Sequence, residues 1–368
     1  MNLIIKRNNI LKPLQKLNSL ISVNHENINI NNVLFKFKKD CLFLISTNLE
    51  IELIVQIFCI KICKFESISV CSKKILHIVR SFPIDSEICF IICNKNMKII
   101  CKNIYFLLSV LPGKNFPKFK KKKFKNSIII SQKKFKDIIY NTQFSMAKQD
   151  VRHYLNGMYF EINQNKMFLV STDGYRISVS SILIHDISPS LYYSIIIPRK
   201  TIMELTKLLN DINITLSINI GSGIIQFYIN EYILSSKLID NNFPDYKSLL
   251  IKNFDTKIQI NRMELKQSLN RASILTHNKF PGVTLQISSE KCIVIACNEQ
   301  DEQVKEELLI NYFGPRIELT MNIHYILEVI NVVKNDFITI LLNHSMSGIY
   351  IKDNQEFYSI YIIMPLIL

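Results

Sequence analysis

The chain has 368 residues, enough for two or three domains with buried cores, and 48% of them are hydrophobic. Its 45 lysines and arginines exceed its 30 acidic residues, and the formal net charge of +15 points to an anionic partner. The longest uncharged stretch, 212–230, is interrupted by polar residues, and the first residues (MNLIIKRNNI) lack a signal-peptide core, so we expect a cytoplasmic protein with no membrane partner.

Charge alone is weak evidence for the kind of partner. The chain is rich in Lys, Asn and Ile and has no Trp and only eight Gly, as an AT-rich genome would produce. Codon drift can therefore account for much of the positive charge.

The cysteines predict neither disulfides nor a metal site. No pair has CxxC spacing, and the seven histidines have no ligand spacing with them, so we expect reduced thiols and no cofactor. The nine cysteines are Cys41, Cys59, Cys63, Cys71, Cys89, Cys93, Cys101, Cys292 and Cys297.

Three segments align without gaps at a spacing of 125 residues and indicate an internal repeat. They are VLFKFKKDCLFLISTN (33–48), MYFEINQNKMFLVSTD (158–173) and VTLQISSEKCIVIACN (283–298). Each has an alternating apolar run, a polar turn and a second apolar run, and ends in the turn formers Asn48, Asp173 and Asn298. Each copy therefore predicts a strand, a turn and a strand.

Two amphipathic segments accompany each copy and predict helices. Those before the strand pairs span 8–21, 131–144 and 261–275, and those after them span 72–82, 198–209 and 322–333, with Pro198 suited to a first helical turn. Strands with two helices, three times over, predict an α+β chain of three similar domains, 1–126, 127–254 and 255–368. The basic run 114–125 (KNFPKFKKKKFK) marks the first boundary, and a solvated linker is as good an explanation for it as a DNA contact.

The segment 142–176 contains the most specific sequence motifs: TQFSMA, QDVR, YLNGM and STDGYR. With IIPRK (196–200), FPDY (243–246) and IIMPL (362–366), it resembles the bacterial sliding clamp family, the beta subunit of DNA polymerase III. The resemblance runs over nearly the whole chain.

The resemblance implies the DNA-clamp fold, with two helices inside and antiparallel sheets outside in each of three repeated clamp domains. Two chains would form a ring as a head-to-tail homodimer around double-stranded DNA. The family's contact surfaces correspond to Lys74, Phe106 and Leu108 on one subunit and Ile274 and Leu275 on the other. Judged without the family, Ile274 and Leu275 are as easily ordinary core residues.

A ring can hold DNA through weak phosphate contacts that do not read sequence. Loop residues matching the family's DNA-touching loop are Gln149, Arg152 and Tyr154. Basic candidates on the helices, each more often a solvated surface charge when considered singly, are Lys12, Lys16, Lys73, Lys74, Arg80, Lys134, Lys136, Arg199, Lys200, Lys207, Arg262, Lys266 and Arg271. Relatives often carry Arg at the position where this chain has Asn24, so the chain departs from the family at that contact.

The resemblance also implies an apolar pocket for short linear peptides of the polymerase III alpha subunit, clamp-loader subunits and repair proteins. Its predicted walls are Leu155, Thr172, Gly174, Tyr175, Arg176, Ile177, Pro244, Leu249, Met346, Gly348, Ile362, Met364, Pro365, Leu366 and Leu368. Each apolar member, taken alone, is more often core than pocket. Relatives tend to have basic residues where this chain has Ser248 and Ile367, which would change peptide affinity.

No catalytic constellation is visible. There is no Gly-rich phosphate loop, zincin motif or GxSxG, and the turn position of Asp173 recurs as Asn48 and Asn298, which favours a structural role over metal binding. We expect a processivity factor that is not an enzyme and shares a nucleotidyltransferase label only through the polymerase complex. The alternative is a generic basic nucleic-acid-binding protein without topological linkage.

Overall fold

The computed structural model describes residues 2–21, 29–38, 41–59, 61–62, 67–93, 95–117, 119, 124, 127–184, 192–250, 253–276, 281–343, 347–353 and 358–366. The chain divides into two compact units, Met1–Lys134 with Lys200–Leu238, and Phe135–Arg199 with Ile239–Leu368. The boundaries of the three predicted domains remain a prediction.

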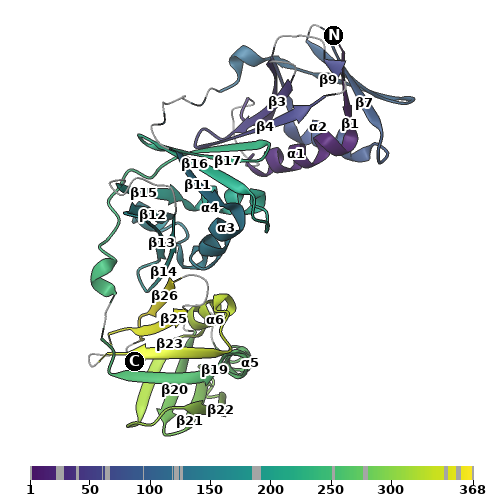
Figure 1. The fold of residues 1–368 in the computed structure, drawn as a ribbon. Helices are drawn as coiled ribbons and strands as arrows, with labels where there is room; N and C mark the ends of the chain where they lie inside the picture. The colour runs from purple at the N-terminus through teal and green to yellow at the C-terminus, as the bar shows by residue number, and fades with distance from the viewer. Residues whose placement is uncertain are drawn as a thin grey trace. The chain divides into compact units, whose positions relative to one another are not determined.

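The first unit contains two antiparallel sheets, ordered β5-β1-β7-β8-β9 and β10-β6-β2-β3-β4-β18-β17-β16-β11 (Figure 1). Its strands are β1 Asn2–Lys6, β2 Asn32–Lys38, β3 Cys41–Thr47, β4 Ile51–Phe58, β5 Lys61–Ile62, β6 Ile68–Cys71, β7 Glu87–Cys93, β8 Asn96–Cys101, β9 Ile104–Ser109, β10 Leu111–Pro112, β11 Ser127–Ser131, β16 Thr215–Gly221, β17 Ile224–Ile229 and β18 Tyr232–Lys237. The pairing of β4 with β18 joins the first and second repeats in one sheet.

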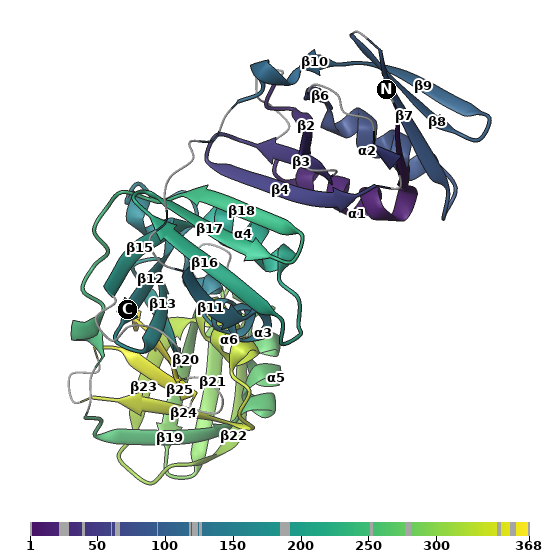
Figure 2. The same ribbon diagram turned by 45° about the horizontal axis from the view of Figure 1, so that its top comes forward.

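Helices α1 (Arg7–Ser19) and α2 (Ser72–Ser81) pack against each other, and α1 also contacts β3 and β4 (Figure 2). The turn η1 spans Gly113–Asn115. Helix α4 (Arg199–Leu208) belongs to this unit apart from its first residue, and α3 (Gln132–Tyr140) crosses the division.

The second unit contains one 12-stranded sheet, with the strand order β15-β12-β13-β14-β26-β25-β24-β19-β22-β21-β20-β23. Its strands are β12 Gly157–Asn163, β13 Lys166–Thr172, β14 Arg176–Leu183, β15 Tyr192–Pro198, β19 Thr256–Asn261, β20 Gly282–Ser288, β21 Lys291–Cys297, β22 Gln303–Asn311, β23 Ile317–Asn322, β24 Phe337–Leu342, β25 Ile349–Asp353 and β26 Tyr358–Ile363. Helices α5 (Arg262–Ala272) and α6 (Ile323–Val332) pack together, and 3-10 turns lie at η2 Gln143–Ser145, η3 His153–Leu155 and η4 Lys247–Leu249.

The predicted repeat is confirmed in the backbone. Each aligned segment forms two paired strands, β2 with β3, β12 with β13, and β20 with β21. The side chains of Asn48, Asp173 and Asn298 each accept hydrogen bonds from backbone N–H groups two to four residues ahead, at 2.7 to 3.1 Å. This recurrence makes the three residues equivalent turn formers.

All six predicted helices are present, with shorter bounds. The prediction of a helix through Phe144 was too long, because α3 ends at Tyr140 and the chain continues into η2. The prediction for Pro198 was wrong, because it is the last residue of β15 and α4 begins one residue later.

Eight of the nine cysteines lie in the described part of the chain and are free thiols, and Cys63 lies outside it. Burial raises the pKa of the Cys292 thiol to about 12, whereas Cys93 and Cys297 are exposed. Within the described residues, no helix has the length and apolar character needed to span a membrane.

Candidate functional site

The strand pair β14 and β26 brings together two parts of the predicted peptide pocket. Arg176 pairs with Ile363 and Ile177 with Ile362, and the N–H of Met364 donates to the carbonyl oxygen of Tyr175 at 2.9 Å. Ile177 and Ile362 are buried in one apolar cluster. Residues nearly 190 positions apart in sequence therefore form one continuous surface.

The chain beyond β26 is held at a second point. The N–H of Leu366 donates to the carbonyl oxygen of Thr320 at 2.8 Å, and its side chain lies over Gly282. Gly348 packs closely against Ile362, because a Cβ added at position 348 would lie only 3.0 Å from the Cγ2 of Ile362. The predicted walls Met346 and Leu368 lie outside the described residues.

Several side chains at this surface are apolar and exposed. Tyr175 is 63% exposed, Met364 48%, Leu249 44% and Leu366 41%. Pro244 and Gly174 are also exposed, and Thr172 and Pro365 are half-buried. Leu155 is different, since its side chain is only 2% exposed.

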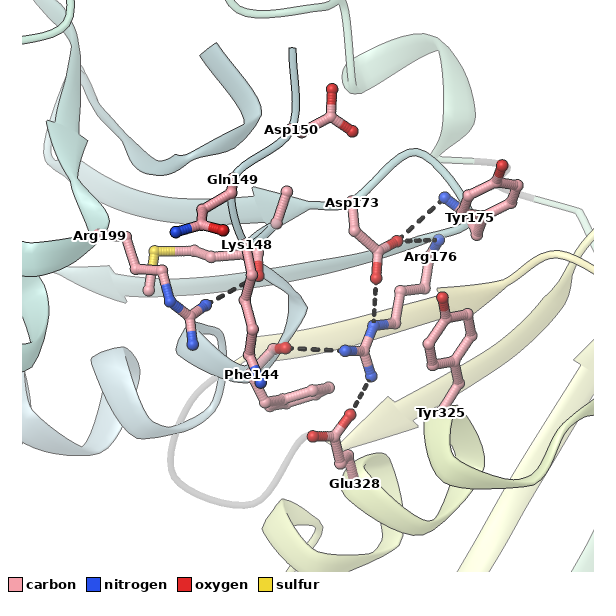
Figure 3. Close-up of a pocket in the computed structure, with 12 residues that line it drawn as sticks. Phe144, Lys148, Gln149, Asp150, Asp173, Tyr175, Arg176, Arg199, Tyr325 and Glu328 are labelled. Atoms are coloured by element: carbon pink, nitrogen blue, oxygen red, sulfur yellow. Dashed lines mark hydrogen bonds and ion pairs between the residues drawn. The ribbon is translucent and has the colours of Figure 1, made fainter. Parts of the chain in front are cut away.

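Arg176, predicted as a pocket wall, directs its guanidinium into a cage formed by Asp173, Glu328, Phe144 and Tyr325 (Figure 3). Its Nε donates to Asp173 at 3.0 Å, one terminal nitrogen pairs with Glu328, and the other donates to the carbonyl oxygen of Phe144 at 2.8 Å. The rings of Phe144 and Tyr325 lie 5.4 and 4.2 Å from the guanidinium carbon. All three nitrogens of the Arg176 guanidinium therefore make contacts within the chain, and these contacts hold the side chain in place.

A cavity of about 510 Å³ lies beside this cage (Figure 3). It is lined by Phe144, Met146, Ala147, Lys148, Gln149, Asp150, Asp173, Tyr175, Arg176, Arg199, Tyr325 and Glu328. Arg199 donates to the carbonyl oxygen of Met146 at 2.8 Å, and burial lowers its pKa from the ordinary value while Glu328 opposes the shift. The sequence prediction missed Tyr325 and Glu328. The only feature of the sequence that pointed to them is their position on the predicted second helix of the third repeat.

The loop before β12 carries the predicted DNA-touching residues. Gln149 is exposed with a φ of +58°, Tyr154 is half-buried, and Arg152 binds Asp150 through two nitrogens at 3.0 and 2.9 Å. Arg152 also donates to the carbonyl oxygen of Asp173 at 3.4 Å. Asp150 and Arg152 thus form an ion pair within the loop. Within the described residues, no group of three or more acidic, His or Cys side chains could hold a metal ion.

The hydrogen bonds from Arg152 lower the pKa of Asp150 from 3.8 to about 2. Because the folded value is the lower one, the pair favours the ordered loop above about pH 4 and is lost as the pH falls toward 2. In Arg152→Ala we expect Asp150 to titrate closer to 3.8 in a carboxyl-carbon NMR titration, since only the backbone N–H bond of residue 152 remains. An unchanged pKa in this variant would contradict the assignment, and Arg152→Lys should give an intermediate value.

The other predicted DNA residues divide into two groups. Lys12, Lys73, Lys74, Arg80, Lys134 and Lys200 are exposed, and Lys136, Arg262 and Lys266 are half-buried. Three others make contacts within the chain: Lys16 donates to the carbonyl oxygen of Lys207 at 2.7 Å, Lys207 pairs with Glu204, and Arg271 pairs with Glu306. Asn24, where relatives often carry Arg, lies outside the described residues.

The predicted dimer residues Phe106 and Leu108 lie on β9, an edge strand with an exposed apolar surface. Ile104, Tyr105, Phe106 and Leu107 are 46%, 66%, 36% and 62% exposed. Ile274 is 79% exposed, Leu275 is half-buried and Lys74 is exposed. Ile274 is therefore not a core residue of its own chain.

Comparison with known proteins supports the sequence resemblance over the whole chain. The family description "DNA polymerase III beta subunit" matches in three parts, the N-terminal domain at residues 1–120, the central domain at 129–245 and the C-terminal domain at 247–367. A beta sliding clamp of Buchnera aphidicola subsp. Rhopalosiphum padi is 38% identical, and that of Escherichia coli K12 is 33% identical, each with full coverage of both chains.

Solved structures agree in fold. The DNA polymerase III subunit beta of Pseudomonas aeruginosa superimposes with a TM-score of 0.95 at 31% identity, with full coverage of both chains. A sliding clamp from the same organism, bound to griselimycin, gives the same TM-score, identity and coverage. The α+β fold with three clamp domains is confirmed, and the chain belongs to the DNA polymerase III beta subunit family, the bacterial beta sliding clamps.

Proposed function

We propose that two copies of this chain close head to tail into a ring that encircles duplex DNA and tethers DNA polymerase III and other partners for processive replication. The observation that carries the proposal is a strand pairing that occurs twice within the chain. Strand β4 of the first repeat pairs with β18 of the second, and β14 of the second repeat pairs with β26 of the third.

The next pair in this series would join two copies. The equivalent strands are β22 in the third repeat and β9 in the first. Along 303–309, β22 is paired with β21 on one side, while β19 reaches only residues 310 and 311 on the other. Among the described strands, β9 pairs only with β8. Each strand thus offers an edge to another chain, and a heterologous contact between them can close a ring.

The apolar character of β9 supports this assignment. Exposed edge strands normally carry charges or turns that prevent association, whereas β9 exposes four consecutive large apolar residues. A surface of this kind is stabilised when a second chain covers it.

Neutralising Arg199 and Lys200 together is expected to lower retention on DNA. Lys200 is exposed at the start of α4 and suits a phosphate contact, whereas Arg199 supports the loop through the carbonyl oxygen of Met146. Lys200→Ala alone should therefore reduce, by about one, the slope of the logarithm of the DNA-binding constant against the logarithm of the salt concentration. Gel filtration at several salt concentrations measures how much of each variant stays on nicked circular plasmid. Unchanged retention of the double variant would count against an inner-face role.

The exposed apolar surface formed by Tyr175, Met364 and Leu366 suits short peptides with Leu or Phe anchors. A labelled peptide of the Gln-x-x-Leu-Phe kind should bind saturably in fluorescence anisotropy. Removing 364–368 should abolish binding, because the deletion removes Met364, which is tied to Tyr175, and Leu366, which is tied to Thr320. Equal binding by the truncated chain would place the peptide elsewhere.

The chain would act in the cytoplasm, as a processivity factor without catalysis of its own. The experiment that tests the ring is loading onto nicked circular DNA by a clamp loader, followed by linearisation. A ring stays on the circle and slides off the linear ends. A generic basic nucleic-acid-binding protein would stay equally on both forms and would dissociate with salt.

A further inference from the structure

Strands β1, β7, β8 and β9 carry apolar side chains on both faces of their sheet. Leu3, Phe90 and Ile99 have no exposed surface and belong to the core. Because side chains alternate along a strand, the residues between them lie on the opposite, outward face. One row of paired residues on this outward face is Ile4, Cys89, Ile100 and Tyr105, and the neighbouring row contains Ile91, Lys98 and Leu107 (Figure 2).

The outward face is open to solvent over β9. Tyr105 is 66% exposed and Leu107 is 62% exposed, and the other apolar members of the two rows are half-buried. Large apolar side chains that lie next to one another on a protein surface mark a contact with another molecule. The contact proposed above between β9 and β22 would use the backbone edge of β9, so it leaves the outward face free.

The third repeat has an apolar face of the same kind, and there the chain itself covers it. Strands β19, β24, β25 and β26 hold the same places around α5 and α6 as β1, β7, β8 and β9 hold around α1 and α2. One row there contains Leu341, Tyr350 and Ile362, which are 9%, 3% and 6% exposed. Leu250 and Phe254, from the segment before β19, pack against this row, and the ring of Phe254 lies 5.1 Å from that of Tyr350. An aromatic side chain from outside the sheet therefore helps to bury the face.

In the second repeat, polar groups interrupt the corresponding face. One row contains Ile129, Ser217, Tyr228 and Ile233. The hydroxyl of Ser217 lies 2.6 Å from that of Ser127, and the hydroxyl of Tyr228 donates to Gln226 at 2.8 Å. Ile129 and Tyr228 are exposed. The first repeat thus combines the apolar composition of the covered face with the exposure of the uncovered one.

The charge around the outward face of the first repeat is positive. Residues 87–109 contain Lys95, Lys98 and Lys102 but a single acidic residue, Glu87, and all four are exposed. The Nζ atom of Lys98 lies 4.8 Å from the centre of the Tyr105 ring. In the third repeat, the Nζ atom of Lys352 lies 4.5 Å from the centre of the covering Phe254 ring. A ligand that complements the outward face therefore combines carboxylates with an aromatic side chain.

We propose that the outward face of β1, β7, β8 and β9 binds an acidic segment of a partner protein, which places an aromatic side chain beside Ile100 and Tyr105 and carboxylates beside Lys98 and Lys102. The aromatic side chain takes the part that Phe254 has in the third repeat. The site lies on a different repeat from the proposed peptide pocket, which is built on β14, β26 and the chain after β26. It does not depend on whether two chains form a ring.

A labelled peptide of about ten residues, with one phenylalanine among aspartates and glutamates, tests the proposal by fluorescence anisotropy. Saturable binding is expected, and replacing its phenylalanine with alanine should weaken binding about tenfold. In the protein, Tyr105→Ser should weaken binding about tenfold and Lys98→Glu about fivefold. A peptide in which lysine replaces each acidic residue should bind Lys98→Glu more tightly than the unaltered protein, because the charges are then exchanged.

Tyr228→Ser is the matched control, because it removes an exposed tyrosine from the corresponding face of the second repeat. It should change the affinity less than about twofold. Removing 364–368 should also leave binding intact, which separates the outward face from the proposed peptide pocket. Circular dichroism confirms that each variant is folded.

Absence of saturable binding, or equal losses in Tyr105→Ser and Tyr228→Ser, would overturn the proposal. Binding that is lost with residues 364–368 would assign the peptide to the pocket and would also overturn it. Association of the unaltered protein beyond a dimer, prevented by Tyr105→Ser, would show that another copy of the chain covers the outward face in place of a partner protein.

Discussion

Phe106→Asp is expected to convert the proposed dimer into monomers, with an association constant reduced at least about 100-fold. Phe106 lies on the edge strand β9, is 36% exposed, and its ring lies 5.9 Å from that of Phe82. A carboxylate there would be buried without a partner when β9 pairs with β22 of another copy, and such burial costs several kcal/mol. Light scattering after gel filtration gives the mass, and retention on nicked circular DNA should fall with it.

The control is Ile129→Asp, which places the same charge on another exposed apolar residue of an edge strand. Ile129 is 62% exposed on β11, outside the proposed β9–β22 contact. It should leave the dimer and DNA retention intact. If both variants dissociate alike, the effect comes from added charge in general, and if Phe106→Asp stays dimeric while folded, β9 is not the subunit interface.

The repeated architecture could be predicted from the sequence because its signals are local. Alternating apolar residues and the turn formers Asn48, Asp173 and Asn298 define three strand pairs without knowledge of distant contacts. Helix ends were less predictable. The apolar period of α3 continues past its last helical residue, since η2 presents Phe144 and Ser145 to the interior in a different backbone form.

The roles of single charged residues could not be predicted from the sequence. Lys16 finds its acceptor 191 residues away, and Arg176 finds Glu328 at a separation of 152. The sequence predicted Lys16 as a DNA-binding candidate and Arg176 as a wall of the peptide pocket, whereas in the structure both side chains make contacts within the chain. Only the fold determines which lysines and arginines remain available for phosphate.

The largest expected effect on the free energy of unfolding involves another long-range contact, between Glu161 and the segment that contains Tyr246 and Lys247. Glu161 on β12 has no exposed surface; Lys247 binds one of its oxygens at 2.5 Å and the hydroxyl of Tyr246 the other at 2.8 Å. Burial raises the pKa of Tyr246 above its ordinary value, so the hydroxyl stays protonated and donates. Next to it, Tyr159 stacks on Phe243 at 4.6 Å. The segment leading to the third repeat is therefore anchored to the sheet through one buried carboxylate.

Removing both donors should leave that carboxylate buried and unpaired. Lys247→Ala alone should cost about 1–2 kcal/mol, a value reduced from that of a fully buried pair because half of the lysine side chain faces solvent. Tyr246→Phe should cost about 1–3 kcal/mol, and the double variant at least about 3 kcal/mol. Urea unfolding measures these losses, and Lys247→Arg should be neutral. Glu161→Leu combined with both changes should recover most of the stability, because the unpaired charge is gone; a failure to recover would show that packing of the aromatic residues, and not the carboxylate, holds the segment.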